Sequence, residues 1–371
     1  MYRASYLRQL VRHEHTYPVL THRPQQGSAN RSLPSIASHD STFVRPVTQQ
    51  RSRSWTSLEE LLAANQVLSQ DPNWCNAATL IERVASFANI ESASRDSVVD
   101  ANLAQQLMER WKSQAPFANQ SYFAQRLAAD GVTEHDLFVC LGEPVTALQA
   151  RLARPQPWLD RLFRAISRPP AVAPLPLPQT LLDHDTVAFL NIIEPLLQEA
   201  IARVQAEAAE LARASDPPPF DSAAVAGLLF SSLPQRLLAI LSRTLVLELH
   251  VARLQGTLSG ETAQQRFCDF LERLRSTEVT IALLQEYPVL ARQLVTHIDH
   301  WVNFSREFLR RLTTDWGQIC STFRGEDPGL LIEIGGDMGD SHRRGRSVLI
   351  AKFVSGLRVV YKPRPLAASV T

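Results

Sequence analysis

Cysteine is scarce in this sequence, and paired cysteines are missing altogether. The four cysteines among 371 residues are dispersed and form no Cys-x-x-Cys pair: Cys75, Cys140, Cys268 and Cys320. Disulfide-rich domains carry many cysteines in a short chain, and thiolate zinc sites usually show Cys-x-x-Cys pairs, so buried free thiols in a reducing compartment are the simpler interpretation. No Gly-x-x-x-x-Gly-Lys-Ser/Thr loop and no His-Glu-x-x-His pair occurs either, which excludes a typical P-loop and a typical zinc-protease helix.

Long apolar runs and a large charge excess are missing too. No stretch of eighteen apolar residues occurs, so no membrane-spanning helix is expected. A net charge of +1 gives no overall attraction to nucleic acid or to an acidic membrane surface. With 45% hydrophobic residues the chain can bury a sizeable core, and we expect a globular protein.

The first 53 residues contain no lysine and almost no acid. Eight arginines and four histidines accompany only Glu14 and Asp40, with Ser, Gln and Pro between them. No continuous apolar segment follows the first charges, which excludes a secretory signal. Such a start suits an organellar transit peptide, a disordered tail or a start codon assigned too early, and we favour the last two.

Helical patterns follow from residue 54. We predict an N-terminal helical region over 54–168, which opens on a capping-box sequence at Thr56 and Glu59. In a predicted helix over 97–111, four residues recur at helical spacing and are expected to face the core: Val99, Leu103, Leu107 and Trp111. Gly131 predicts the end of a later helix. The Pro-rich residues 169–178 cannot form the interior of a helix and predict a semi-rigid extended linker.

A helical body is predicted over residues 179–325. Its expected helices span 189–211, 233–258, 263–274, 279–286, 289–301 and 305–323. The segment 233–258 is almost wholly apolar, so we expect it to lie in the centre of the body.

Charged and titratable residues within this body have structural interpretations. Glu248 and Arg253 are expected to pair with groups on neighbouring helices, because buried charges need partners. His250 lies on the same predicted helix and is expected to be a buried, hydrogen-bonded histidine. His297 and His300 lie near one helical turn apart and could bind a metal, but no further ligand pattern accompanies them.

Residues 326–371 carry the most informative pattern. Two short apolar runs, 348–350 and 359–361, flank a turn at 354–356 and predict a β-hairpin with a three-residue connection. Side chains alternate along the second strand, so Val360 and Lys362 share a face. A lysine late in a strand, beside a loop rich in glycine and charge, is a layout that phosphate sites use. An exposed hairpin with solvated charges explains the same spacing.

The order of several motifs resembles the start of the dehydratase domain of type 2 (LanM-type) lanthionine synthetases. Three motifs in the hairpin region carry this resemblance: Gly339-Asp340-x-His342, Gly345-Arg346-Ser347-Val348 and Val360-Tyr361-Lys362-Pro363-Arg364. Upstream segments of the helical body resemble the same family: residues 245–260, 266–270, 286–292, Trp301 and 310–323. The resemblance covers roughly residues 105–371 and is strongest after residue 240.

The resemblance implies a bacterial, cytoplasmic enzyme of lantibiotic (RiPP) biosynthesis. In that family a lipid-kinase-like core uses ATP and Mg²⁺ to phosphorylate Ser and Thr of a precursor peptide. It then eliminates phosphate to leave dehydroamino acids, and a separate zinc cyclase domain forms the lanthionine rings. The implied partners are the leader–core precursor peptide and an export transporter, with no nucleic acid.

The resemblance also implies roles for individual residues. Lys362 matches the strand lysine that holds the nucleotide phosphates. Asp340 and His342 match the catalytic Asp-x-His pair used in phosphorylation and elimination. Arg346 and Arg364 are both expected to contact nucleotide or phosphate. Alternatively, Arg346 could steady the hairpin and Arg364 could pair with an acidic group. No metal ligand is assigned within these residues.

The expected fold is therefore mainly α, with a helical body followed by the hairpin that starts a kinase-like lobe at 326–371. Counterparts of the family's later catalytic loop, its Mg²⁺ ligands and its cyclase domain are not found in the sequence, which predicts an N-terminal fragment that is inactive by itself. Two other interpretations stay open. One is a catalytically inactive helical scaffold or peptide-binding remnant of a truncated gene, and the other is an unrelated small-molecule kinase with a similar strand lysine.

Overall fold

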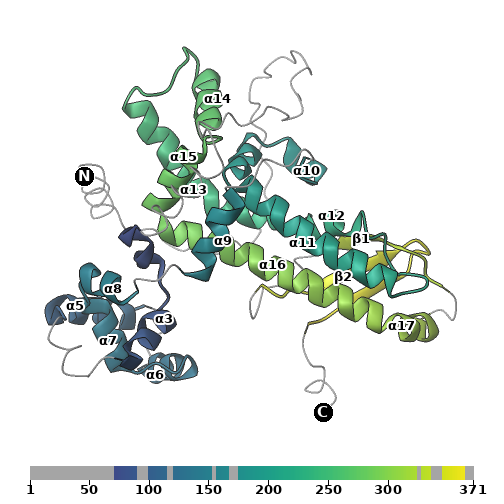
Figure 1. Ribbon diagram of the computed structural model, residues 1–371, viewed down its shortest axis with the longest axis horizontal. Helices are drawn as coiled ribbons and strands as arrows, with labels where there is room; N and C mark the ends of the chain where they lie inside the picture. Colours follow the sequence, from purple (N-terminus) through teal and green to yellow (C-terminus); the bar gives the residue numbers. More distant parts are fainter. Residues whose placement is uncertain are drawn as a thin grey trace, which may run out of the picture. The chain divides into compact units, whose positions relative to one another are not determined.

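The chain is mostly helical, with a small three-stranded sheet near its C-terminal end, as the sequence predicts (Figure 1). The computed structural model describes residues 71–89, 99–114, 120–152, 156–166, 174–323, 327–335 and 345–363. All of them belong to one compact unit, residues 48–371. The capping box expected at Thr56 lies outside the described residues.

Five short α-helices and two 3₁₀ helices form the first part of the described chain. They are η1 (Pro72–Ala77), α3 (Leu80–Ala85), η2 (Ser86–Asn89), α5 (Ala101–Lys112), α6 (Gln120–Ala129), α7 (Glu134–Gly142) and α8 (Val145–Arg151). Met108, Phe123, Leu127 and Leu137 form a small core between them. Helix α6 ends as predicted, because Gly131 adopts a positive φ of 69° and the N–H of Val132 returns to the carbonyl of Leu127.

The predicted buried face of α5 is only partly correct. Val99 and Leu107 are half-buried, but Leu103 and Trp111 are each 44% exposed, and Ala104 and Met108 are buried instead. The helix approaches α7 so closely that a Cβ added at Gly142 would lie 2.9 Å from the Ala104 side chain. Small residues therefore decide which face packs inward, and larger apolar residues are left outside.

The rest of the described helices lie in or around a larger core. These are α9 (Pro157–Ile166), α10 (Gln179–Leu182), η4 (Asp185–Ile193), α11 (Glu194–Arg213), α12 (Val225–Phe230), α13 (Leu233–Leu254), α14 (Ala263–Arg273), α15 (Thr277–Glu286), α16 (Pro288–Thr314) and α17 (Trp316–Phe323). The same core includes Trp74 of η1 and the apolar face of α9. In the described part of the Pro-rich segment, Leu175 and Leu177 pack against this core, so that part does not act as a free spacer.

Several predicted helix boundaries need correction. The helix expected over 189–211 begins as the 3₁₀ helix η4 and becomes α-helical at Glu194. The helix break expected at residues 302–304 is absent, because α16 continues through them to Thr314. The break between α16 and α17 falls at Asp315 instead. No glycine or proline interrupts residues 302–304, and Val302 and Phe304 are buried, so nothing ends the helix there.

Helix α13 is buried over its first half and exposed over its second. Leu237, Leu241 and Leu245 are fully buried, but Val246 is 50% and Leu254 is 71% exposed. The prediction of a wholly central helix is therefore wrong. His250 is exposed as well, with Nδ1 3.3 Å from Arg253 Nη2, so it is not a core histidine. Glu248 has a partner outside its helix, as predicted, but the contact is a 2.7 Å hydrogen bond from the Tyr287 hydroxyl and not an ion pair. Arg253 is exposed and contacts His250 of its own helix, so its predicted pairing with a neighbouring helix is not found among the described residues.

The buried carboxylate of Glu207 links α11 to α16 through hydrogen bonds. Glu207 is 7% exposed and accepts hydrogen bonds from Arg306 Nε at 2.7 Å and Arg310 Nε at 2.5 Å. Burial by itself raises the pKa of the Glu207 carboxyl, but the bonds and charges of Arg310 and Arg306 outweigh burial and hold the pKa below its usual 4.5. The charged form of Glu207 therefore stabilises the folded protein.

Replacing Glu207 by glutamine should lower the unfolding free energy by about 1–3 kcal/mol at neutral pH, since two charge-assisted bonds are weakened. Because the folded pKa is depressed, this contribution is present above pH 4.5 and is lost as pH falls through the folded value. Urea unfolding at several pH values should show the difference between wild type and Glu207→Gln shrinking below that pH. Glu210→Gln, on the exposed side of α11, is the control; an equal loss there would contradict the assignment.

The sheet consists of β1 (Leu331–Gly335), β2 (Leu349–Phe353) and β3 (Arg358–Tyr361), antiparallel and in that order. The predicted hairpin is confirmed, with Ile350 opposite Val360. Its connection has four residues, not three, and Gly356 takes a positive φ of 83° within it. Strand β1 was not predicted.

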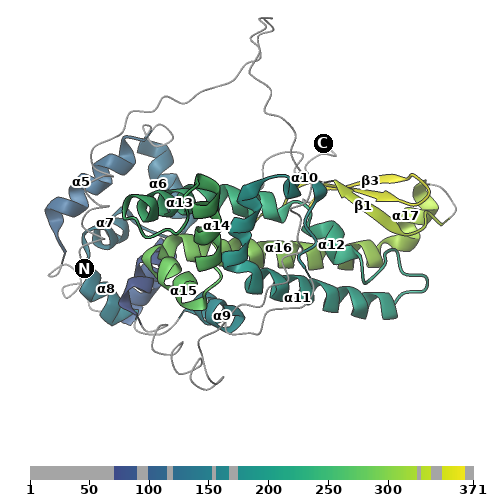
Figure 2. The same ribbon diagram turned by 90° about the horizontal axis from the view of Figure 1, so that it is seen from above.

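One face of the sheet packs against α16 and α17, beside which the strands lie in Figures 1 and 2. Trp316 of α17 lies 5.2 Å from Phe353, and Phe308 of α16 lies 5.3 Å from Tyr361, measured between ring centroids. A two-stranded hairpin is marginal by itself in water, so these aromatic contacts supply the support it needs.

Candidate functional site

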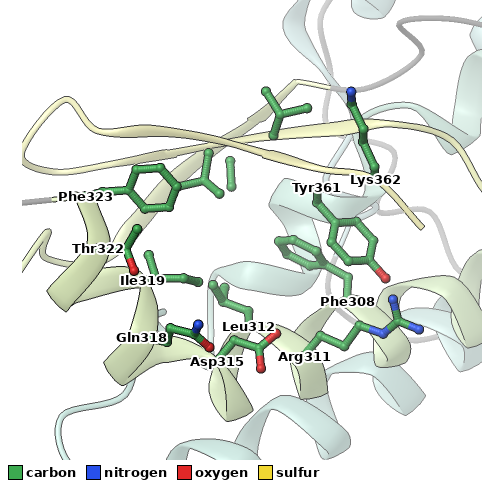
Figure 3. A pocket seen from close by; sticks show the side chains of 13 residues that line it. Phe308, Arg311, Leu312, Asp315, Gln318, Ile319, Thr322, Phe323, Tyr361 and Lys362 are labelled. Atoms are coloured by element: carbon green, nitrogen blue, oxygen red, sulfur yellow. The ribbon is translucent and has the colours of Figure 1, made fainter. Parts of the chain in front are cut away.

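A groove lies between the end of α16, α17 and the strands β2 and β3 (Figure 3). Its volume is about 490 Å³, within the range of small-molecule sites. Apolar side chains form most of its walls, among them Phe308, Leu312, Ile319, Phe323, Val359 and Tyr361. Polar groups also line it: Arg311, Asp315, Gln318 and Thr322 from the helices and Lys362 from the strand end.

Lys362 directly follows β3 and is exposed. Strand alternation places Tyr361 against the helices and directs the Lys362 ammonium away from them, as Figure 3 shows. Val360 lies on the same open face and is 53% exposed, which confirms the predicted sharing of a face. Among the described residues no carboxylate pairs with Lys362, so its charge is available on the open face of the sheet, although the residue also lines the edge of the groove.

Glu307 of α16 ties the hairpin to the helices. Arg346 donates to Glu307 Oε2 from Nε at 2.9 Å and from Nη2 at 2.5 Å. Arg311 Nη2 lies 2.8 Å from Oε1 of the same carboxylate, and the Tyr361 hydroxyl makes a weak 3.5 Å contact with it. Burial, and then the charge of Glu307, raise the pKa of Tyr361 to about 12. These contacts agree with Arg346 steadying the hairpin; phosphate binding by Arg346 stays a prediction.

Glu307→Gln should destabilise the protein by about 1–2 kcal/mol, because the carboxylate that accepts two hydrogen bonds from Arg346 loses its charge while its partners stay partly solvated. Thermal unfolding of the two proteins measures this. The matched control is Glu333→Gln, since Glu333 is 57% exposed and pairs with Lys352 at 3.0 Å on the surface of the sheet. If both variants melt alike, Glu307 does not anchor the hairpin.

Asp340, His342 and Arg364 lie outside the described residues, so their positions and roles stay predictions. The described chain stops at Gly335, the end of β1, and resumes at Gly345, which has a positive φ of 77°. A Cβ at Gly345 would also lie 3.3 Å from Cβ of His300, so both the positive φ and the lack of space favour glycine at this position.

No metal site emerges from the part of the chain that the structure describes. The rings of His297 and His300 lie 6.5 Å apart, and no cluster of three or more His, Cys, Asp or Glu side chains is present among these residues. All four cysteines are free. Burial raises the pKa of Cys140 to about 11, as expected for a structural thiol, but Cys268 is exposed and contradicts the prediction of buried thiols.

Sequence reasoning missed two parts of this site. The polar residues of the groove recur three to four positions apart at 311, 315, 318 and 322, a helical stripe that was readable in the sequence. The contact between Glu307 and Arg346 had no local signal, because 39 positions separate the two residues.

A comparison with protein families adds one match. Residues 287–371 match a family model described as a domain of unknown function, DUF4135. The match spans α16, α17 and all three strands, and therefore contains the groove. A comparison with curated proteins found no match. Within the described ranges, no helix is long and apolar enough to cross a membrane.

Proposed function

We propose that this chain carries the start of the dehydratase domain of a LanM-type lanthionine synthetase. Such an enzyme phosphorylates Ser and Thr of a precursor peptide and then eliminates phosphate to leave dehydroamino acids. The main support is the segment 287–371: it holds the three motifs of the resemblance and matches a domain that is found in these synthetases. The antiparallel hairpin that ends in Lys362 agrees with the start of a kinase-like lobe.

Lys362 fits a nucleotide phosphate. Its ammonium is exposed on the open face of the sheet, next to a groove of about 490 Å³ that the residue lines, and a compact positive charge offsets charge on phosphate oxygens. Aromatic contacts of Tyr361 and the anchoring by Glu307 hold the strand that carries it. Bound ATP and Mg²⁺ would supply the phosphoryl group and neutralise its charge; the described residues offer no carboxylate cluster for the metal.

His342 is the proposed proton carrier of elimination. A histidine with an ordinary pKa near 6.5 can both accept and donate a proton near neutral pH. Asp340, two positions away, is the proposed second member of the pair.

Replacing His342 by alanine tests this function in a synthetase that contains the sequence. If His342 serves elimination, phosphorylated precursor should accumulate as a mass gain of about 80 Da per site, the mass of one phosphoryl group. A mass spectrum of the treated peptide and a melting curve of the mutant measure the two effects separately. His250→Ala is the control, because His250 is exposed on α13. A His342→Ala enzyme that melts early yet dehydrates normally would assign His342 to the fold instead.

A catalytically inactive scaffold is the second candidate. The exposed apolar residues on the second half of α13, including Val246, Leu247 and Leu254, are the observation that favours it, since such a surface suits protein binding. Absence of any phosphorylated or dehydrated product with the unaltered synthetase would favour this candidate.

A further inference from the structure

Strand β3 forms one edge of the sheet. It pairs with β2 on one side, and no strand of the described residues pairs with it on the other. The groove described above is lined by four consecutive residues at the end of this strand, 359–362. Adjacent side chains leave a strand on opposite faces, so a groove that all four residues line runs along the edge of the strand.

The backbone of β3 offers hydrogen bonds along this edge. Phe353, at the end of β2, directs both of its backbone groups at the other arm of the hairpin. Its N–H donates to the Leu357 carbonyl at 2.9 Å, and its carbonyl accepts from the Gly356 N–H at 2.8 Å. Backbone groups alternate between the two sides of an antiparallel strand, so Arg358 and Val360 direct theirs away from β2. An edge of this kind is a template for a further strand.

The helices supply an apolar floor beneath such a strand. Leu312, Ile319 and Phe323 line the groove from α16 and α17, and Figure 3 shows them between the helices and the strands. Phe323 is 57% exposed, so its ring is available for contact. Every second side chain of a strand added at the β3 edge would face this floor and bury apolar surface there.

The opposite, open face of the edge is positively charged. Arg358 and Lys362 lie on it on either side of Val360, and neither forms an ion pair among the described residues. The charge of Lys352, on the neighbouring strand, is matched by Glu333 at 3.0 Å. Antiparallel pairing with the β3 of a second copy, centred on Val360, would place Arg358 opposite Lys362, and like charges in that position destabilise a sheet. The edge therefore disfavours a second copy and favours a strand that is acidic on this face.

We propose that the β3 edge and the groove beside it bind an extended acidic peptide as a fourth strand of the sheet. The peptide backbone pairs with Arg358 and Val360, alternate apolar side chains enter the groove, and carboxylates on the other face meet Arg358 and Lys362. Glu-Leu-Val-Leu-Glu is a minimal sequence with this pattern, because its glutamates and its valine share one face. The assignment does not rest on the proposed function.

Fluorescence anisotropy of this labelled pentapeptide, titrated with the 371-residue chain, tests the proposal. We expect saturable binding. Phe323→Ser should weaken it roughly tenfold, because the groove loses its exposed ring. Arg358→Gln should weaken it less and should also reduce its dependence on salt. Two matched controls should bind like wild type: Leu254→Ser, at a 71% exposed position on α13, and Lys352→Gln. Melting curves should show all four variants folded.

Two altered peptides separate strand addition from simple apolar or charge attraction. N-methylation of the central valine removes the N–H that pairs with Val360 and should abolish binding. Lys-Leu-Val-Leu-Lys reverses the charges and should bind at least roughly tenfold more weakly. Absence of saturable binding, binding that survives N-methylation, or binding that Phe323→Ser leaves unchanged would overturn the proposal. So would binding to this chain that is lost in a synthetase containing the sequence, because another part of the protein would then occupy the edge.

Discussion

Lys362→Met should lower the rate of precursor dehydration by roughly two to three decades, in a synthetase that contains this sequence. Methionine keeps most of the length of the side chain and deletes the charge that would face the phosphates. Loss of one preorganised electrostatic contact typically costs about 3–4 kcal/mol of transition-state stabilisation. A time course of water loss from the precursor, followed by mass spectrometry, measures the rate.

The matched control is Lys352→Met on the neighbouring strand. Lys352 also carries an exposed ammonium, but it pairs with Glu333 at 3.0 Å, so its replacement should leave dehydration near normal. Both variants should melt close to wild type, because neither lysine buries much apolar area. Near-normal dehydration by Lys362→Met would show that the strand lysine has been misassigned.

The hairpin was predictable because its signals are local. Two short apolar runs and a glycine in the turn predicted β2 and β3, and the alternation of side chains along a strand placed Val360 and Lys362 on one face. Strand β1 gave no comparable signal, because burial does not alternate along it and its register with β2 shifts between Leu331 and Glu333. The pairing of β1 with β2 could therefore be recognised only from the structure.

Burial was harder to predict than helix type. The exposed second half of α13 and the partly wrong buried face of α5 both came from segments whose helical character was correctly predicted. In α5 the close approach of Gly142 to Ala104 chose the buried face, and no pattern within the helix records that approach. The spacing of apolar residues therefore predicted that these segments are helices, but it did not predict which face of each helix is buried.

The candidate site was predicted in part for the same reason. Lys362 could be chosen from the motif and from strand alternation. The groove beside it requires α16 and α17 to meet β3, and its anchor Glu307 contacts a residue of a different element. Tertiary proximity of this kind has no signature in a single sequence.

Phe353→Ala should lower the unfolding free energy by about 3–5 kcal/mol, the usual cost of deleting a buried phenylalanine ring. Phe353 is fully buried on β2, and its ring centroid lies 5.2 Å from that of Trp316 on α17. Its loss opens a cavity between the sheet and the helices that support it. Equilibrium urea unfolding, with the slope checked against wild type, measures the loss.

Two further variants separate packing from strand propensity. Val354→Ala changes the next residue, which is 63% exposed in the turn, and should cost less than about 0.5 kcal/mol. Phe353→Leu keeps much of the volume and should recover most of the stability that alanine loses. Because Lys362 follows β3 and β3 pairs with β2, Phe353→Ala should also release the strand that carries the lysine. If Phe353→Ala unfolds like wild type, α16 and α17 do not stabilise the sheet through this contact.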